Sequence, residues 1–449
     1  MSKQRIQLSD HFTYSRLLRF VLPCIGTMLF TSIYGIVDGL CVSNFVGKTA
    51  FAAVNLIMPL PMLLGTIGFM LGTGGSAIVG ITLGEGDQKK ADRYFTLFLL
   101  AALVSVSVLA VLGIVFLRPI AVLLGAKGEL LDYAVRYGRI LMVSLPTFAL
   151  QNMFQSFFVT AEKPHLGFWF TVGAGCTNMV LDVLMVGIWG WGVEGAAIAT
   201  FISQLVGGVL PVFYFIDRSN SSRLHLCKTS FYSKVLWDAC INGSSELMTN
   251  LSMSLVNILY NYQLLRLAGE NGVAAYGVIM YAAFLFVAVF VGYAVGSAPI
   301  VSFHYGARNH AEVHNLYRKS LRLIAVVAVT LTLASMFIIP CVARIFVGYD
   351  AELLALTSRA FRLYALSFLI MGFNVYASSF FTALGDGVTS ALISFLRTLV
   401  FQVIAILLLP LLLGIDGIWL AVTAAELAAL AVSAAMLLTK DKVFHYRKA

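Results

Sequence analysis

The sequence predicts an all-α polytopic membrane protein, with twelve transmembrane helices in two six-helix lobes related by a pseudo-twofold axis along the membrane normal. Three observations lead to this fold class. Of the 449 residues, 60% are hydrophobic and only 11% are charged, whereas soluble domains contain roughly 25% charged residues. Apolar runs long enough to cross a bilayer as helices follow one another along the chain. The second half of the chain repeats features of the first.

The apolar runs divide evenly between the two lobes. A helix rises about 1.5 Å per residue, so runs of 20 or more residues span a hydrocarbon core of roughly 30 Å. The expected helices lie at 17–43, 52–82, 94–117, 132–160, 165–187 and 192–216, and then at 236–262, 274–304, 318–346, 356–383, 388–413 and 417–438. The expected domains are a tail at 1–16, an N-lobe at 17–216, a polar linker at 217–235, a C-lobe at 236–438 and a tail at 439–449.

An internal repeat supports this division. The motif AAVNLIM at 52–58 resembles AAYGVIM at 274–280, an offset of 222 residues. At the same offset Gly84 falls on Gly306. Because six helices is an even number, the second copy starts on the same side of the membrane as the first. The two copies are therefore expected to be parallel, as in two-lobed transporters that alternate access.

The loops alternate in their content of Lys and Arg. One set is short and poor in these residues, at 189–195, 267–272 and 413–417, whereas the intervening loops and the C-terminal tail are basic. By the positive-inside rule we expect both termini and the linker to be cytoplasmic. The N-terminus lacks the apolar segment and cleavage site of a signal peptide. The net charge of +9 is thus attributed to cytoplasmic loops, and no nucleic-acid binding is expected.

The sequence contains no enzyme signature. Its six cysteines show no CxxC spacing, which argues against a disulfide framework and a zinc site. GxSxG, HExxH and Walker A motifs are all missing from the sequence. We therefore expect neither an enzyme nor a cofactor, and any pumping has to draw on an ion gradient.

Polar residues interrupt the apolar helices of the N-lobe. A charged side chain near the bilayer centre costs about 2.5–3.5 kcal/mol on insertion scales, so residues such as Asp38 usually have a role or a partner. Asn178 and Asp182 are four residues apart on one face of the fifth helix, and Thr200 lies on the sixth. If these side chains converge, their oxygens suit a hard cation such as Na⁺, and the paired carboxylates also suit proton storage. The alternative is that Asn178 and Asp182 simply bond to each other and to backbone.

The C-lobe carries a different set of charges. At the repeat offset Asp38 maps to Tyr260, so the polar set of the N-lobe is missing from the second copy. Glu246, Arg397 and Glu426 lie instead in the seventh, eleventh and twelfth helices. Arg397 is expected to pair with Glu426 or Glu246, because intramembrane charges commonly pair with one another. A rival expectation is that one of the glutamates faces the substrate cavity and attracts cations.

Pro23 lies inside the first helix, fifteen residues before Asp38. A proline removes one helical hydrogen bond and bends the helix, either statically or as part of a movement. Small residues in GFMLGTGGSAIVG at 68–80 predict close helix–helix packing.

These features resemble the multidrug and toxic compound extrusion (MATE) transporters. The resemblance rests on VDGLCVSNFVGKTAFAAVNLIMPL at 37–60, which is similar to the MepA-like bacterial branch, and on GVEGAAIAT at 192–200. It extends over about residues 15–440. It implies a multi-pass protein of the bacterial inner (plasma) membrane, in which Na⁺ or H⁺ enters as lipophilic, often cationic drugs leave.

The resemblance also implies a cation site. Family members that bind Na⁺ in the first lobe use an Asp in the first helix, an Asn and an Asp in the fifth, and a Thr and an Ala carbonyl in the sixth. The matching residues here are Asp38, Asn178, Asp182, Thr200 and Ala196. Another branch uses a Glu in the seventh helix and an Asp in the tenth. Glu246 is similar to the first of these, but the expected tenth helix contains no Asp.

The sequence thus predicts a secondary multidrug antiporter that exports amphipathic, cationic compounds in exchange for Na⁺ or H⁺. Its expected partners are these small molecules and the lipid bilayer, and we expect a monomer. The alternative is a flippase for lipid-linked oligosaccharides or other amphiphiles in the wider superfamily, which Arg397 keeps open. A membrane-embedded enzyme is a third, less favoured alternative.

Overall fold

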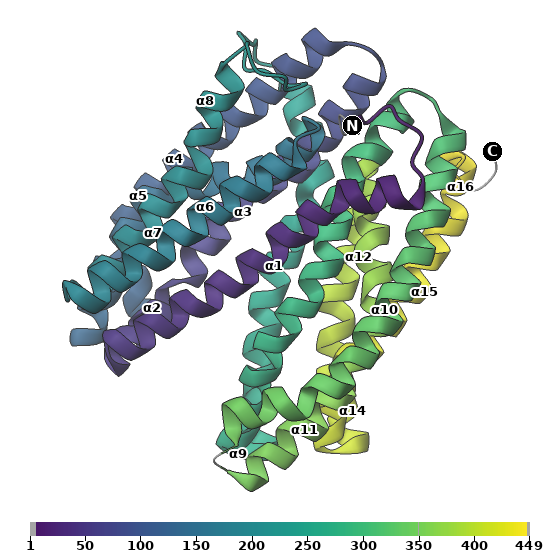
Figure 1. Ribbon diagram of the computed structural model, residues 1–449. Helices are drawn as coiled ribbons and strands as arrows, with labels where there is room; N and C mark the ends of the chain where they lie inside the picture. Colours follow the sequence, from purple (N-terminus) through teal and green to yellow (C-terminus); the bar gives the residue numbers. More distant parts are fainter. Residues whose placement is uncertain (1–5, 349, 447–449) are drawn as a thin grey trace.

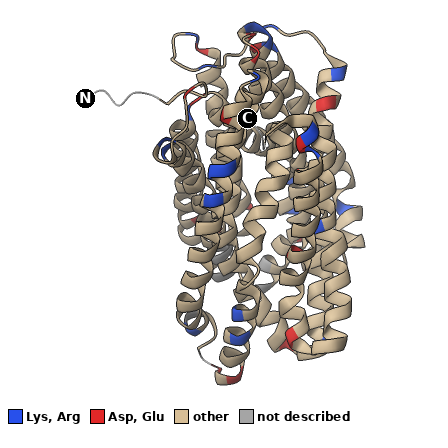
Figure 2. Cartoon of the chain, turned by 90° about the vertical axis from the view of Figure 1, so that its right-hand side faces the viewer, with Lys and Arg blue, Asp and Glu red and all other residues tan. Residues whose placement is uncertain are grey.

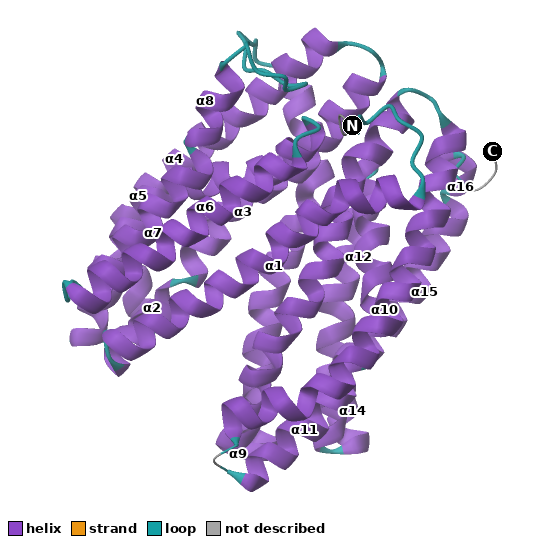
Figure 3. Cartoon of the chain, viewed as in Figure 1, coloured by secondary structure: helices purple, strands orange, loops and turns teal. Residues whose placement is uncertain are grey.

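The computed structural model describes residues 6–348 and 350–446 of the chain, leaving aside the side chains of 39–44, 48, 51 and 345. Within these ranges the chain forms α-helices, two short π-helical segments and loops, and no strand (Figure 3). In Figure 1 the helices of the first half form one group, and those of the second half form another beside it. We call these the N-terminal group (α1–α8) and the C-terminal group (α9–α16).

The N-terminal group follows the expected order, but several expected helices are broken. Pro59 begins a new helix, as proline often does at a first helical position, and divides the helix expected at 52–82. The elements are α1 (Tyr14–Phe45), α2 (Lys48–Ile57), α3 (Pro59–Gly84), α4 (Gln88–Leu123), α5 (Glu129–Thr160), α6 (Pro164–Asp182), the π-helix η1 (Val183–Ile188), α7 (Gly192–Gly208) and α8 (Leu210–Ile216).

The C-terminal group begins with α9 (Ser233–Gly306), which consists of two helices joined at a kink and covers two expected helices. It turns at Gly269, whose φ of 60° and ψ of −150° are accessible essentially only to glycine. The remaining elements are α10 (His310–Val347), α11 (Ala351–Ala365), α12 (Phe368–Ala383), α13 (Gly387–Phe395), the π-helix η2 (Leu396–Val400), α14 (Phe401–Leu413), α15 (Ile415–Thr439) and α16 (Asp441–Phe444).

Nine of the described helical segments are long and apolar enough to cross a membrane, or ten if the bent pair α11 and α12 counts as one span. These two helices meet at an angle of 46°. Figure 2 shows Lys, Arg, Asp and Glu mostly toward the ends of the bundle, with largely uncharged helix between them. The fold is therefore that of an all-helical, multi-pass membrane protein.

The backbones of the two groups pack closely against each other along α3 and α9. A Cβ atom at Gly84 would fall on the carbonyl oxygen of Phe303, and a Cβ at Gly306 would fall on the carbonyl oxygen of Ile81. Gly84 and Gly306 are 222 residues apart in the chain, and so are Ile81 and Phe303. The contact is therefore reciprocal, with each group offering a glycine to the equivalent carbonyl of the other.

The chain before α1 runs across both groups. Its Leu8 N–H donates to Glu162 Oε1 of the loop after α5 at 2.9 Å, and its Phe12 N–H donates to Glu312 Oε1 of α10 at 2.9 Å. The side chains of Leu8 and Phe12 are fully buried. We call residues 6–13 the N-terminal strap, because they tie the two groups together at the end that carries both termini (Figure 1).

A residue of the linker reinforces this closure. Arg223 donates from Nη1 to Glu162 Oε1 at 2.5 Å, and its guanidinium lies 4.8 Å from the ring centroid of Phe303 in α9. A cation over an aromatic face is attracted by the ring quadrupole. The linker therefore contacts both groups at the same end as the strap.

Candidate functional site

Two carboxylates from helices that are distant in the sequence lie side by side within the N-terminal group. Asp38 lies in the last third of α1, and Asp182 is the last residue of α6. The two carboxyl groups are within hydrogen-bonding reach of each other. The Asp182 side chain is fully buried, and the π-helix η1 starts at the next residue. Single π-helical turns inside α-helices are frequent at functional sites.

Hydrogen-bond donors to this pair are scarce among the residues that the structure describes. Oδ1 of Asp38 and both carboxylate oxygens of Asp182 are buried without a donor from the part of the chain that the structure describes. Two ionised carboxylates in contact repel each other, and a buried oxygen without a partner is costly. The arrangement is satisfied by one proton shared between the two groups or by a cation bound between them.

The other N-lobe candidates lie on the neighbouring turns and helix. Asn178, only 2% exposed, stands one turn before Asp182 on α6, and its Nδ2 has no partner among the described residues. Ala196 is buried on α7, and Thr200 is half-buried one turn later. Within the described part of the chain, no interaction joins the Thr200 hydroxyl to either carboxylate. The structure thus brings Asp38 and Asp182 together, while Thr200 remains only a neighbour on an adjoining helix.

Two tyrosines that the sequence did not single out belong to this site. Tyr137 of α5 is 1% exposed and interacts electrostatically with both Asp38 and Asp182. Tyr34 precedes Asp38 by one helical turn and interacts with it in the same way. Both phenols bring a hydroxyl, able to donate or accept, near carboxylate oxygens of which three have no donor among the described residues. The four-residue spacing of Tyr34 and Asp38 could have predicted that they share a helix face, but nothing in the sequence pointed to Tyr137.

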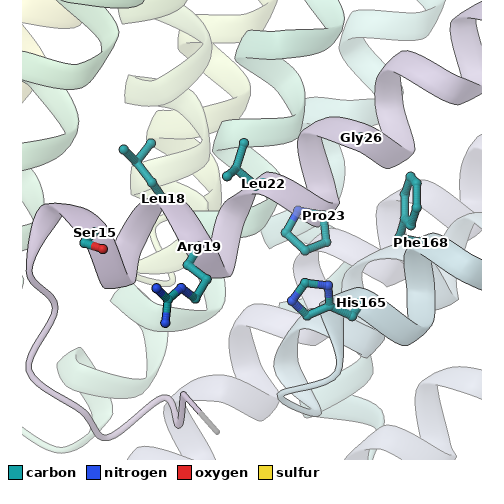
Figure 4. Close-up of a pocket in the computed structure, with 8 residues that line it drawn as sticks. All are labelled: Ser15, Leu18, Arg19, Leu22, Pro23, Gly26, His165 and Phe168. Atoms are coloured by element: carbon teal, nitrogen blue, oxygen red, sulfur yellow. The ribbon is translucent and has the colours of Figure 1, made fainter. Parts of the chain in front are cut away.

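Pro23 lies beside a cavity of about 660 Å³ between α1 and α6 (Figure 4). In the figure, Arg19 and Pro23 lie on the side of α1 that faces His165, and Leu22 points the other way. About one helical turn after Pro23, the ring of Phe168 packs closely against Gly26. A Cβ atom added to Gly26 would lie only 3.0 Å from that ring. The helix therefore has open space beside its proline and a close contact immediately after it.

The C-terminal group contains a separate charge cluster. Nη1 of Arg397, in η2, lies 3.9 Å from Oε1 of Glu426, in α15, and their side chains are 14% and 2% exposed. Glu426 accepts a hydrogen bond at 2.7 Å from Nδ2 of Asn374, in α12. Glu246 of α9 also interacts electrostatically with Arg397. Arg397 thus interacts with both glutamates, of which Glu426 is the one within ion-pairing distance. Asn374 is a further partner of Glu426 that the sequence did not suggest.

Comparison with known proteins gives the family. The MatE family model matches the chain twice, over residues 23–184 and over residues 247–408. This chain belongs to the MatE family. The two matched stretches fall one in each helical group, on either side of the linker.

Known relatives match this chain over nearly its whole length, and solved structures share its fold. The chain is 21% identical to the multidrug export protein MepA of Staphylococcus saprophyticus over 436 residues, covering 96% of this chain and 95% of the relative. MepA of Staphylococcus aureus is also 21% identical, over 433 residues with the same coverage. An outward-facing structure of a multidrug resistance MATE family transporter superposes with a TM-score of 0.92 at 22% identity, covering 100% of both chains.

A further solved structure, of a MOP superfamily transporter from Pyrococcus furiosus, superposes with a TM-score of 0.89 at 22% identity, again over 100% of both chains. At this level of identity the superpositions establish the fold. The protein is therefore an all-helical, multi-pass membrane protein of the MatE family.

Proposed function

We propose that this protein is a secondary multidrug efflux antiporter that exports amphipathic, cationic compounds in exchange for Na⁺ or H⁺. The observation that carries the proposal is the contact between the half-buried Asp38 and the fully buried Asp182, two carboxylates whose close approach favours a shared proton or a bound cation. Relatives described as multidrug export proteins, matched over nearly their whole length, support the transport of drugs.

The proposed architecture is twelve helices in two six-helix lobes, each built on one of the two family matches. Ten spans, with α11 and α12 counted as one, become twelve when α9 is divided at Gly269 and α5 is included. The reciprocal contact of Gly84 and Gly306 supports a pseudo-twofold axis between the lobes. We place both termini in the cytoplasm of a bacterial cell, as the basic loops favour.

With this orientation the chain is closed toward the cytoplasm. In Figure 1 the two groups approach each other near the termini and lie further apart at the opposite end. The N-terminal strap and Arg223 hold the closed end together. The proposed state is therefore one that faces outward.

Coupling follows from the position of the carboxylate pair. Asp38 is on α1 and Asp182 on α6, so a cation or proton bound between them draws these helices together, with Asn178 and Thr200 as further oxygen ligands and Ala196 offering a carbonyl. Pro23 and the space beside it allow α1 to bend in response. Exchange requires that the ion and the drug each bind preferentially to a different facing of the protein.

The test is efflux of a fluorescent lipophilic cation from proteoliposomes, with a Na⁺ gradient and a pH gradient each imposed alone. We expect efflux under at least one gradient, and we expect Asp38→Asn to abolish it. Asp132→Asn, which removes an exposed carboxylate from α5, is the matched control and should transport normally. Undiminished gradient-driven transport by Asp38→Asn would refute the coupling role, and efflux under neither gradient would refute antiport.

A further inference from the structure

The charge cluster of the C-terminal group faces a cavity of about 320 Å³. Arg397 and Glu426 form part of its wall, and Tyr260 and Tyr276 of α9 form another part. This volume is near the lower end of small-molecule pockets, which hold roughly 300–1,000 Å³. The cavity therefore combines charges of both signs with aromatic surface, in a space suited to a small ligand.

One hydrogen-bond donor in the charged wall, Nη1 of Arg397, has no acceptor among the described residues. Glu426 is fixed by Asn374 rather than by the arginine, because Asn374 Nδ2 donates at 2.7 Å to its Oε2 and at 2.9 Å to its backbone oxygen. Ser433 in turn donates to Asn374 Oδ1 at 2.9 Å. Nη1 of Arg397 remains 3.9 Å from the Glu426 carboxylate, and among the described residues it has no hydrogen-bond acceptor. A buried guanidinium N–H without an acceptor is costly, and a bound carboxylate would satisfy it.

The aromatic wall is flat and firmly held. The rings of Tyr260 and Tyr276 stack with centroids 4.9 Å apart and an angle of 12° between their planes. The Tyr260 hydroxyl donates to the Ile418 carbonyl at 3.4 Å, so its donor is already engaged by the protein. Methionines from two helices, Met280 and Met371, complete this part of the lining. Stacked aromatic rings and adaptable thioethers suit a planar aromatic group.

We propose that this cavity binds aromatic zwitterions in which an ammonium and a carboxylate group lie close together. The carboxylate pairs with Arg397, the ammonium pairs with Glu426, and the aromatic group lies against the tyrosines. The two protein charges are 3.9 Å apart, so only a ligand whose charges are also close together reaches both at once. This inference rests on the proposed export function and adds to its cationic substrates a second class, which is zwitterionic and has no net charge.

Charge balance favours the zwitterion over simpler ions. A ligand with only a carboxylate brings a negative charge beside Glu426 and Glu246, both of which interact with Arg397. A ligand with only an ammonium group leaves the arginine N–H without its acceptor. A zwitterion satisfies both protein groups and leaves the net charge of the cavity unchanged.

The test uses three forms of one compound, 3-(2-naphthyl)alanine, in isothermal titration calorimetry with the purified full-length protein. These are the free zwitterion, its methyl ester, which is a cation, and its N-acetyl derivative, which is an anion. We expect the zwitterion to bind at least tenfold more tightly than either derivative. Arg397→Gln should weaken zwitterion binding by roughly ten- to a hundredfold, the range for hydrogen bonds to charged groups, and should leave the ester within about twofold. Glu426→Gln should weaken the zwitterion and the ester, but not the N-acetyl form.

Arg318→Gln, which removes an exposed arginine from α10, is the control and should bind all three forms like the unmodified protein. Should Arg397→Gln fail to fold, Arg397→Lys keeps the charge but not the planar fork, and it should retain part of the preference. Equal binding of the three forms, or an unchanged preference in the folded Arg397 variant, would overturn the proposal. If the protein exports a lipophilic cation but does not prefer the zwitterion, the inference about this cavity is wrong and the proposed function stands. If no gradient drives any export, the proposed function itself is wrong.

Discussion

The carboxyl groups of Asp38 and Asp182 lie within hydrogen-bonding reach of each other, although 144 residues separate them in the chain. Their contact joins α1 to the end of α6, immediately before a π-helical segment. Both oxygens of Asp182 and Oδ1 of Asp38 lack a donor among the described residues. Under the proposed function, the protonation or ion occupancy of this pair would set how closely the two helices approach.

Tyr137 is predicted to tune the carboxylate pair. Its buried hydroxyl interacts with both acids, so Tyr137→Phe removes a polar neighbour without a change in ring size. We expect the concentration of the coupling ion that gives half-maximal efflux to rise about three- to tenfold, the size expected when an interaction worth up to about one pKa unit is lost. Ion titrations of transport in proteoliposomes measure this. Tyr133→Phe, one turn away on α5, serves as the control, and equal behaviour of the two variants would contradict the prediction.

The glycines at the α3–α9 contact are predicted to be required for stability. Gly84→Ala and Gly306→Ala each place a methyl group on a carbonyl oxygen of the opposite helix, and overpacking of this kind costs about 1–3 kcal/mol. Both variants should therefore unfold at a lower temperature in detergent. Gly277→Ala is the matched control, because a Cβ there meets no described atom within 4 Å. A normal melting temperature for both glycine variants would show that the helices separate freely.

The strap is predicted to depend on one carboxylate. Glu312 accepts from the Phe12 N–H at 2.9 Å, contacts His11 Nδ1 at 2.6 Å and accepts from Asn315 Nδ2 at 2.8 Å. In Glu312→Gln the side chain loses its charge and one of its acceptor oxygens, which costs about 1–3 kcal/mol for a buried group. Hydrogen exchange at residues 6–13 should become roughly ten times faster or more. Glu352→Gln, an exposed glutamate of α11, should leave exchange unchanged, and unaltered exchange in Glu312→Gln would argue against the strap.

The loop between α12 and α13 is predicted to lose stability in acid. Partial burial acts to raise the pKa of Asp386, but hydrogen bonds from Lys440 and Thr389 outweigh it and hold this pKa below its ordinary value. The Lys440 contact is 2.8 Å. A lowered pKa means that the pair stabilises the fold above the unfolded pKa of about 3.9 and ceases to do so as the pH falls through the folded value.

Asp386→Asn should therefore lower the free energy of unfolding by about 1 kcal/mol at pH 7. This difference should shrink as the pH falls below about 4. Melting temperatures of the variant and the unmodified protein between pH 7 and pH 3 provide the measurement. Lys440→Met should show the same dependence, and a difference that persists at pH 3 would assign the effect to something other than this pair.

Much of the fold followed from composition and periodicity, because an apolar run of bilayer length has few alternatives to a helix. Breaks within those runs were harder to place. Pro59 does stand at the division of α2 from α3, but Pro23 and Pro146 lie inside helices that continue past them. A proline therefore marks a possible break, and tertiary packing decides whether the helix ends.

The site was predictable where chemistry alone selects a residue. A buried Asp is rare enough in a membrane helix to draw attention, so Asp38 and Asp182 were found. Tyr137 was not, because the chain contains 18 tyrosines, and only its burial near Asp38 and Asp182 in the folded chain distinguishes this one. Likewise the sequence limited the expected partners of Arg397 to two glutamates. Only the structure shows that the carboxylate of Glu426 also accepts a hydrogen bond from Asn374.

The reciprocal contact of Gly84 and Gly306 limits how the two halves of the molecule can move. Backbone lies against backbone there, so we expect sliding of one half past the other to be blocked and rotation of one half about this contact line to remain open. Spin labels attached on either side of this line near the strap would then keep a nearly constant separation during turnover. Labels in α2 and at the turn of α9, where Figure 1 labels these two helices, would show the largest change in separation.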